Sequence, residues 1–185
     1  LDAQFELATA ALIGGLTNSA TIASGVGTSN FNITFGGLGI QDSKHVIGHA
    51  FYHPDDRTRW EMSEKIRAFH FSLIARTMRT LAGVPEGNGT MLDRTIIVYL
   101  SDNAETHHST CYEWPFVVFG GPEAGLQRGG RIVHYPDYGK PGHKTINTLY
   151  STFLHASGNA RDDFGQLDPH LDPHMHRGPL SELLA

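Results

Sequence analysis

The feature that most constrains the fold is an apolar run at residues 95–100, where hydrophobic side chains follow one another without alternation. Such a run is typical of a central parallel strand, because a strand covered on both faces needs apolar side chains on both. Residues 115–119 predict a second strand, and residues 131–135 a shorter third strand nearer an edge. We therefore predict an α/β fold, with a partial, doubly wound, mainly parallel sheet and flanking helices.

Helical periodicity marks three segments: residues 2–16, residues 56–81 and residues 144–156. The second is about 40 Å long if fully helical, with Asp55 or Asp56 as its cap. The apolar positions that define two of these helices are Ile66, Phe69, Leu73 and Ile74 in the second, and Ile146, Leu149, Tyr150, Phe153 and Leu154 in the third. Gly158 stands where a helix-ending glycine belongs.

Two further segments complete the pattern along the chain. Residues 20–26 resemble a buried strand, and residues 27–39 form a long stretch rich in Gly, Asn, Ser and Thr. A chain of 185 residues suits one domain, so we predict a single domain over residues 1–185, forming the C-terminal part of a larger fold.

Net charge and hydropathy limit the classes of partner that the sequence predicts. The net charge is −5 and no Lys/Arg run occurs, which argues against nucleic acid as the main partner. No apolar stretch is long enough to predict a transmembrane segment. The single cysteine, Cys111, cannot form a disulfide within the chain, so cysteine usage does not indicate an oxidising or a reducing compartment.

Histidine is unusually frequent, at 12 of 185 residues, which motivates a search for metal ligands. Asp102 and Asn103 follow the apolar run directly, and His107 and His108 come shortly after. A carboxylate with two imidazoles supplies three ligands for zinc, with a fourth position left for water. Asp102 and Asn103 alone would instead offer oxygen ligands to calcium. The alternative is that Asp102 caps a loop and the histidines are solvated.

Other histidines extend this hypothesis. His49 and His53 have the i, i+4 spacing that places two side chains on the same side of a helical turn, although Pro54 limits a helix there. His143 lies in a Gly/Pro-rich loop before a predicted helix, from which it could swing towards the strand end. The alternative for each is an ordinary loop residue, and the later histidines, His170, His174 and His176, fit a solvated tail.

The sequence shows no obvious nucleophile. Covalent phosphoryl or sulfuryl transfer needs an activated Ser, Thr or Cys. No Gly-x-Ser-x-Gly elbow, P-loop or dinucleotide-binding glycine fingerprint is present. A complete hydrolase is therefore not predicted from the motifs alone.

A group of motifs, taken in order, resembles the C-terminal half of the secreted family named for a His-x-x-Ser-His-His motif. They are 49–53 (His-Ala-Phe-Tyr-His), 85–93 (Pro-Glu-Gly-Asn-Gly-Thr-Met-Leu-Asp), 95–102 (Thr-Ile-Ile-Val-Tyr-Leu-Ser-Asp), 115–121 (Pro-Phe-Val-Val-Phe-Gly-Gly), 148–158, 164–165 and 178–180. That family in turn resembles the alkaline-phosphatase/sulfatase-like superfamily. The resemblance implies a periplasmic or secreted location and metal ligands at Asp102, Asn103 and His107 or His108.

Two departures from the family pattern separate two readings of function. Tyr52 replaces the motif serine and Pro54 its last histidine, and the nucleophile of the superfamily normally belongs to an N-terminal half. The first reading is an accessory or structural extracytoplasmic subunit with a residual metal site, which binds a protein partner or the missing half of the same fold. The alternative is a metal-dependent phosphate or sulfate ester hydrolase whose nucleophile lies in that missing half.

Overall fold

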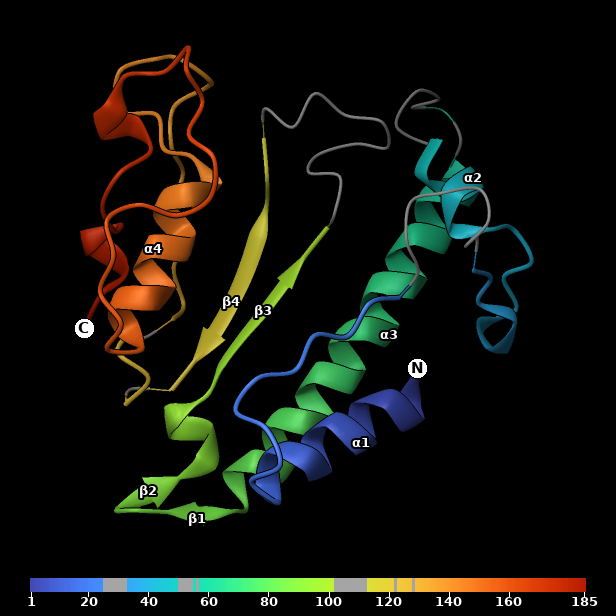
Figure 1. Ribbon diagram of the computed structural model, residues 1–185. Helices are drawn as coiled ribbons and strands as arrows, with labels where there is room; N and C mark the ends of the chain where they lie inside the picture. Colours follow the sequence, from blue (N-terminus) through green and yellow to red (C-terminus); the bar gives the residue numbers. More distant parts are fainter. Residues whose placement is uncertain (25–32, 50–54, 56, 102–112, 122, 128) are drawn as a thin grey trace. The chain divides into compact units, whose positions relative to one another are not determined.

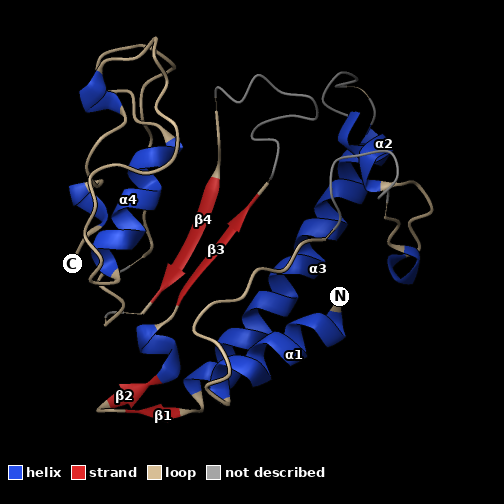
Figure 2. Cartoon of the chain, viewed as in Figure 1, coloured by secondary structure: helices blue, strands red, loops and turns tan. Residues whose placement is uncertain are grey.

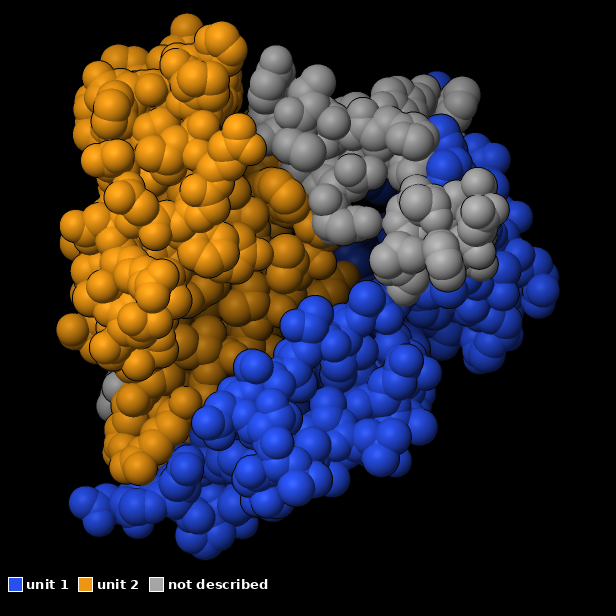
Figure 3. All heavy atoms as spheres, viewed as in Figure 1, with its two compact units in different colours: residues 1–91, 102–111 blue, residues 92–101, 112–185 orange. Residues whose placement is uncertain are grey.

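The computed structural model describes residues 1–24, 33–49, 55, 57–101, 113–121, 123–127 and 129–185 (Figure 1). The chain divides into two compact units, coloured in Figure 3. Unit 1 is built on Leu1–Met91, and unit 2 on Leu92–Ser101 with Tyr112–Ala185. Helix is more extensive than strand (Figure 2). The predicted single domain over residues 1–185 stays a prediction.

Unit 1 is organised around the long helix α3, Arg57–Ala82, which confirms the helix predicted at residues 56–81. Its buried residues include Ile66, Leu73 and Ile74, the apolar positions expected from the 3.6-residue period. His70 is buried on the same helix, and its ring meets Phe35 edge-on at 5.6 Å between centroids. Burial lowers the pKa of His70, with a smaller contribution from Lys44.

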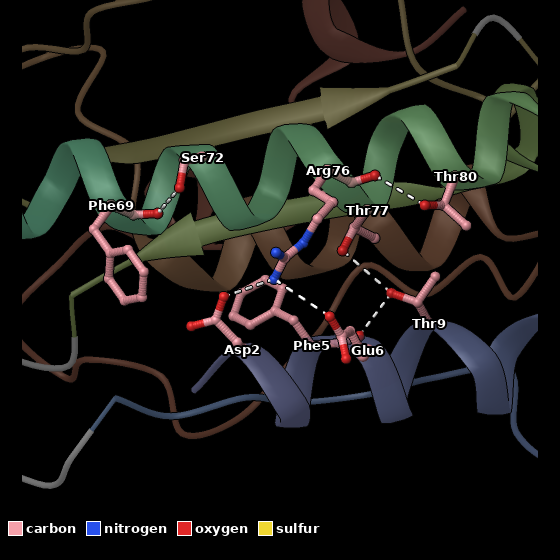
Figure 4. Close-up of polar contacts among 9 residues, drawn as sticks. All are labelled: Asp2, Phe5, Glu6, Thr9, Phe69, Ser72, Arg76, Thr77 and Thr80. Atoms are coloured by element: carbon pink, nitrogen blue, oxygen red, sulfur yellow. Dashed lines mark hydrogen bonds and ion pairs between the residues drawn. The ribbon is translucent and has the colours of Figure 1, made fainter. Parts of the chain in front are cut away.

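Helix α1, Asp2–Ile13, packs along α3 (Figure 4). An exposed ion pair joins Arg76 Nη2 to Asp2 Oδ1 at 2.9 Å, and the hydroxyls of Thr9 and Thr77 lie 3.2 Å apart. The helix predicted at residues 2–16 is thus confirmed, but it ends at Ile13 because Gly15 has a positive φ of 66°.

A second short helix, α2, Lys44–Gly48, also belongs to unit 1. Ser43 caps it by accepting a hydrogen bond from the Val46 amide at 3.2 Å. Ile47, 1% exposed, packs in a core cluster with Phe35, Ile40 and Ile66. A 3₁₀ turn, η2, Gly36–Leu38, precedes α2.

The strand predicted at residues 20–26 is wrong where the structure describes it. Residues 20–24 form no strand, and most of them are exposed. Their apolar character is modest, and β-propensity alone does not form a strand that lacks a pairing partner. The predicted loop at residues 27–39 is described only from residue 33 onward.

A tight hairpin follows α3. β1, Pro85–Glu86, pairs antiparallel with β2, Gly89–Thr90, and Gly87 in the turn has a φ of 58°. A two-residue hairpin turn requires a positive φ at its first central residue, and glycine adopts a positive φ without strain. A 3₁₀ turn, η4, Met91–Arg94, then leads into the main strands.

Unit 2 contains the two strands predicted from the apolar runs: β3, Ile96–Leu100, and β4, Phe116–Gly120. They pair antiparallel with Val98 opposite Val118, so the predicted parallel, doubly wound sheet is wrong. The apolar run indicates burial of a strand but not its direction, which depends on whether the connection returns beside the strand or crosses over. The broader expectation of mixed helix and sheet holds.

The third predicted strand, residues 131–135, is also wrong, because this segment forms no strand. Ile132 is 96% exposed. The segment is anchored by side-chain hydrogen bonds rather than by backbone pairing with a strand. Arg131 donates to the carbonyl of Glu182, and the Tyr135 hydroxyl donates to Glu182 Oε1, each at 2.5 Å.

Helix α4, Ile146–Ala156, confirms the helix predicted at residues 144–156, and Gly158 has the expected positive φ of 78°. Its most deeply buried face is Thr148, Leu149, Ser151 and Thr152, whereas the rest of the predicted apolar stripe is only half-buried. The C-terminal segment packs on this face, with the short turns η5, Pro173–Met175, and η6, Ser181–Leu183.

The C-terminal segment is tied to α4 and to residues 124–127 by backbone contacts. The Leu180 amide donates to Thr152 Oγ1 at 2.8 Å, and the Ala185 amide donates to the carbonyl of Gly125 at 3.1 Å. Gly125 has a φ of 75°, and a Cβ there would lie 2.5 Å from the carbonyl oxygen of Ala156.

Within the described ranges, no helix combines the length and apolar character needed to cross a bilayer.

Candidate functional site

The predicted strand-end site lies in the connection between β3 and β4. Asp102, Asn103, His107 and His108 lie outside the described residues, so their role as metal ligands stays a prediction. The structure does describe the two ends of the connection. Leu100 lies opposite Phe116 in the sheet, and the Trp114 indole donates to the Ser101 carbonyl at 2.7 Å.

This closed base has a consequence for ligands carried by the connection. Because the strands are antiparallel neighbours, residues 101–115 leave and re-enter the sheet at the same end. The two described ends of the connection that carries the four predicted ligands are therefore held close together.

His49, the second predicted site, lies at the C-terminal end of α2, and His53 lies outside the described residues. The structure pairs His49 with His45, one turn earlier, and their Nε2 atoms are 3.4 Å apart. The ring centroids are 5.1 Å apart and the planes are inclined at 67°. Both rings are half-buried.

His143, the third predicted site, belongs to unit 2, so it is not in the same unit as His49. It is 8% exposed, its Nδ1 lies 2.8 Å from the Pro136 carbonyl, and its ring meets Tyr138 edge-on at 5.6 Å. The carbonyl can only accept, so Nδ1 donates, and in the neutral ring Nε2 then carries the lone pair. That tautomer suits a metal ligand, but the predicted approach to Asp102 stays a prediction.

Tyr138 also belongs to a polar group that the sequence did not indicate. Its hydroxyl donates to Asp168 Oδ2 at 2.6 Å, and the His170 amide donates to Oδ1 of the same carboxylate at 2.8 Å. The hydrogen bond from Tyr138 is the main cause that lowers the pKa of Asp168, followed by the His170 amide and by the positive potential of His170 and His176.

The turn at Asp168 is repeated four residues later. Asp168-Pro-His170 and Asp172-Pro-His174 each place the aspartate so that it accepts the amide of the histidine, at 2.8 Å and 3.2 Å. Asp172 Oδ1 also lies 2.5 Å from His174 Nδ1. The expectation of a solvated tail is therefore only partly right, since His174 is exposed but His176 is 3% exposed.

His176 lies at the end of this repeat. Its Nδ1 is buried and has no hydrogen-bond partner among the described residues. Nearby, the amide of Thr145 donates to the Met175 carbonyl at 3.1 Å and Lys144 Nζ donates to the His174 carbonyl at 3.0 Å. These contacts hold the histidine-rich turns against the start of α4.

A second tyrosine–carboxylate pair fixes the segment before His143. Burial is the main cause that raises the pKa of Tyr135, with the hydrogen bond to Glu182 next. The same hydrogen bond lowers the pKa of Glu182. This pair anchors the backbone of this segment to the turn η6.

Among the described residues, no group of three or more His, Cys, Asp or Glu side chains is arranged to hold a metal ion. Sequence reasoning did not bring Tyr138 together with Asp168, because the two residues are 30 positions apart in the chain and share no motif. The Asp-Pro-His repeat was a readable signal for the turns, since aspartate before proline favours such backbone caps.

Comparison of the chain with protein families, with curated proteins and with solved structures finds no match.

Proposed function

We propose that this chain is a non-catalytic, accessory or structural component of an extracytoplasmic assembly. In this proposal its scaffold is related to part of the alkaline-phosphatase-like fold, and a protein partner or the remaining half of that fold completes its sheet. The periplasmic or secreted location comes from the family resemblance alone. The observation that carries the proposal is the incomplete burial of β3 and β4.

The register shows that both faces of the β3–β4 ribbon are apolar. Cross-strand partners lie on the same face, so Ile97, Tyr99, Val117 and Phe119 share one side, and the alternate residues share the other. No residue of either strand, all of which are described, is fully buried. Leu100 and Val117 are each 39% exposed. Strands with apolar residues on both faces are typical of the interior of a larger sheet.

The edges of the ribbon support the same proposal. Within the described residues, β3 pairs only with β4, so each strand has an outer edge. A two-stranded sheet is marginally stable on its own. Addition of a strand to an exposed edge is a common mode of protein recognition, since backbone groups supply the hydrogen bonds.

The first test is the behaviour of the isolated chain in size-exclusion chromatography with light scattering, over a range of concentrations. We expect self-association, because the apolar faces then cover one another. Val117→Lys should shift the chain towards monomer. The matched control, Ile132→Lys, changes an apolar residue that is exposed but outside the sheet, and should leave the association unchanged. A chain that stays monomeric at every concentration would count against the proposal.

A second candidate function is a metal-dependent phosphate or sulfate ester hydrolase whose nucleophile comes from a missing N-terminal half. It is favoured by the hydrogen bond from the Trp114 indole to the Ser101 carbonyl, which joins the two described ends of the β3–β4 connection. Asp102, Asn103 and one or both of His107 and His108 are the ligands proposed for zinc, or the oxygens of the first two for calcium. A bound metal would polarise the ester and lower the pKa of a water ligand.

Metal analysis and ester hydrolysis separate the two candidates. The hydrolase predicts ester turnover and an equivalent of bound metal, both of which Asp102→Ala removes. His134→Ala, which changes an exposed histidine outside the loop, is the control. A protein that hydrolyses no phosphate or sulfate ester, and whose metal content Asp102→Ala does not change, leaves only the accessory role.

A further inference from the structure

We propose that His45 and His49 form a two-imidazole chelate for a divalent transition-metal ion of the zinc class. The site lies on α2 (Figure 1), in unit 1, and involves neither the 101–115 loop nor the incomplete sheet. It is therefore independent of the proposed function. The spacing of the two histidines in the sequence makes the site conceivable, and the distance between their nitrogen atoms carries the argument.

The separation of the two nitrogen atoms matches the geometry of a tetrahedral metal. Zinc–nitrogen bonds are about 2.0–2.1 Å long, so two imidazoles at a tetrahedral angle have their nitrogens about 3.3–3.4 Å apart. The Nε2 atoms of His45 and His49 are 3.4 Å apart. An ion can therefore bridge them with little movement of either ring.

The backbone under the two rings is held in place. Ser43 caps the start of α2, and Ile47, at 1% exposure, anchors the helix in the core of unit 1. Successive residues of a helix are about 100° apart, so His45 and His49 each lie about 160° from Ile47, on the side away from the core. Both residues are half-buried, so the fold restricts the movement of the two rings as well as that of the backbone.

The donor set selects the class of ion. Neutral imidazole binds zinc, copper and nickel, whereas calcium and magnesium prefer oxygen ligands. In the absence of metal, one ring can donate a hydrogen bond to the other at this distance. When metal binds, both Nε2 atoms act as acceptors and each proton resides on Nδ1. The two imidazoles supply two of the four tetrahedral ligands, and acid opposes binding because each imidazole must be deprotonated.

Isothermal titration of the full chain with zinc chloride tests the proposal, with calcium chloride as the negative ion. The wild type should bind zinc at a site that the double variant His45→Asn, His49→Asn lacks, so that the stoichiometry falls by one equivalent. Each single variant should weaken that site roughly a hundredfold, because a chelate becomes a single contact. His134→Asn, which changes an exposed histidine outside unit 1, is the matched control.

A wild type that binds no zinc, or a double variant that binds as many equivalents as the wild type, would overturn the proposal. A second measurement does not depend on variants that fold. Zinc should slow the acylation of His45 and His49 by diethyl pyrocarbonate in the wild type, read by peptide mass spectrometry, and leave His134 unaffected. The proposal would also be overturned if zinc left the acylation rates of His45 and His49 unchanged.

Discussion

The buried hydroxyl of Thr152 offers a sharp test of what holds the C-terminal segment to α4. Thr152 Oγ1 donates to the Thr148 carbonyl at 2.7 Å and accepts from the Leu180 amide at 2.8 Å. Thr152 has no exposed surface, and Leu180 is 4% exposed. Replacing Thr152 by valine keeps the shape of the side chain but leaves the Leu180 amide buried without its acceptor.

The expected loss follows from these two contacts. A buried donor that loses its partner costs about 1–3 kcal/mol, and the methyl group gained in its place returns at most about 0.8 kcal/mol. Thr152→Val should therefore lower the free energy of unfolding of unit 2 by about 1–2 kcal/mol. Thr152→Ser, which keeps the oxygen and loses a methyl group, should cost about 1 kcal/mol by lost burial alone.

The neighbouring residue supplies a matched control. Ser151 is equally buried, and within the described part of the chain its Oγ has no hydrogen-bond partner. Ser151→Ala should therefore be neutral or stabilise by up to about 1 kcal/mol, because it removes an unsatisfied buried hydroxyl.

Urea unfolding followed by tryptophan fluorescence measures these differences. Trp114 belongs to unit 2 and Trp60 to unit 1, so a Trp60→Phe background makes the signal specific to unit 2. Equal stability of Thr152→Val and its parent, or an equal loss in Ser151→Ala, would refute the reasoning that the hydroxyl of Thr152 is what secures the segment.

Two further predictions concern unit 2. Tyr138→Phe should raise the pKa of Asp168 towards its ordinary value, and an unchanged titration of this carboxyl group by NMR would contradict the prediction. Because the pKa of Asp168 is lowered in the folded state, this carboxylate stabilises the fold above its unfolded pKa, and the stabilisation is lost as the pH falls through the folded pKa. The urea midpoint of the variant should therefore depend less on pH across the acidic range than that of the wild type. Gly125→Ala should cost at least about 2 kcal/mol, because φ is 75° and the new Cβ would lie 2.5 Å from the Ala156 carbonyl oxygen; Gly129→Ala, whose Cβ meets nothing within 4 Å, is the control, and equal midpoints for the two would be inconsistent with the close contact.

Local patterns predicted the elements whose cause is local. The 3.6-residue period of Ile66, Leu73 and Ile74 located α3 to within one residue at each end. Gly158 ended α4 as expected, because only glycine adopts a positive φ without strain. The apolar runs located β3 and β4, since an unbroken run of four or five β-branched, aromatic or leucine residues favours a strand.

Properties that depend on distant residues were not predictable in this way. The run at β3 indicates burial but contains nothing that sets its direction relative to β4, so the parallel arrangement was wrongly inferred. Residues 131–135 have strand-like composition, yet Glu182, far along the chain, holds them by side-chain contacts. Buried hydroxyls on α4 were missed because hydrophobic periodicity ignores threonines that bond to their own helix.

The candidate sites also differ in whether local sequence or contacts between distant residues bring their side chains together. His45 and His49 are one helical turn apart, so their proximity could be read from spacing, although the sequence prediction paired His49 with His53 instead. The bond between Tyr138 and Asp168 joins two loops, and no sequence pattern announces it. Asp102 and its neighbours remain a sequence-based prediction.

The open ribbon of β3 and β4 carries a hazard for the chain when it is produced alone. Each strand is a short, uncharged segment of β-branched and aromatic residues, which is the composition that stacks into cross-β fibrils. Arg94 and Glu113 flank the two strands in the sequence, where charges act as gatekeepers against such stacking. Neutralising both residues should therefore shorten the lag before fibrils form, and a strand-donating partner should lengthen it.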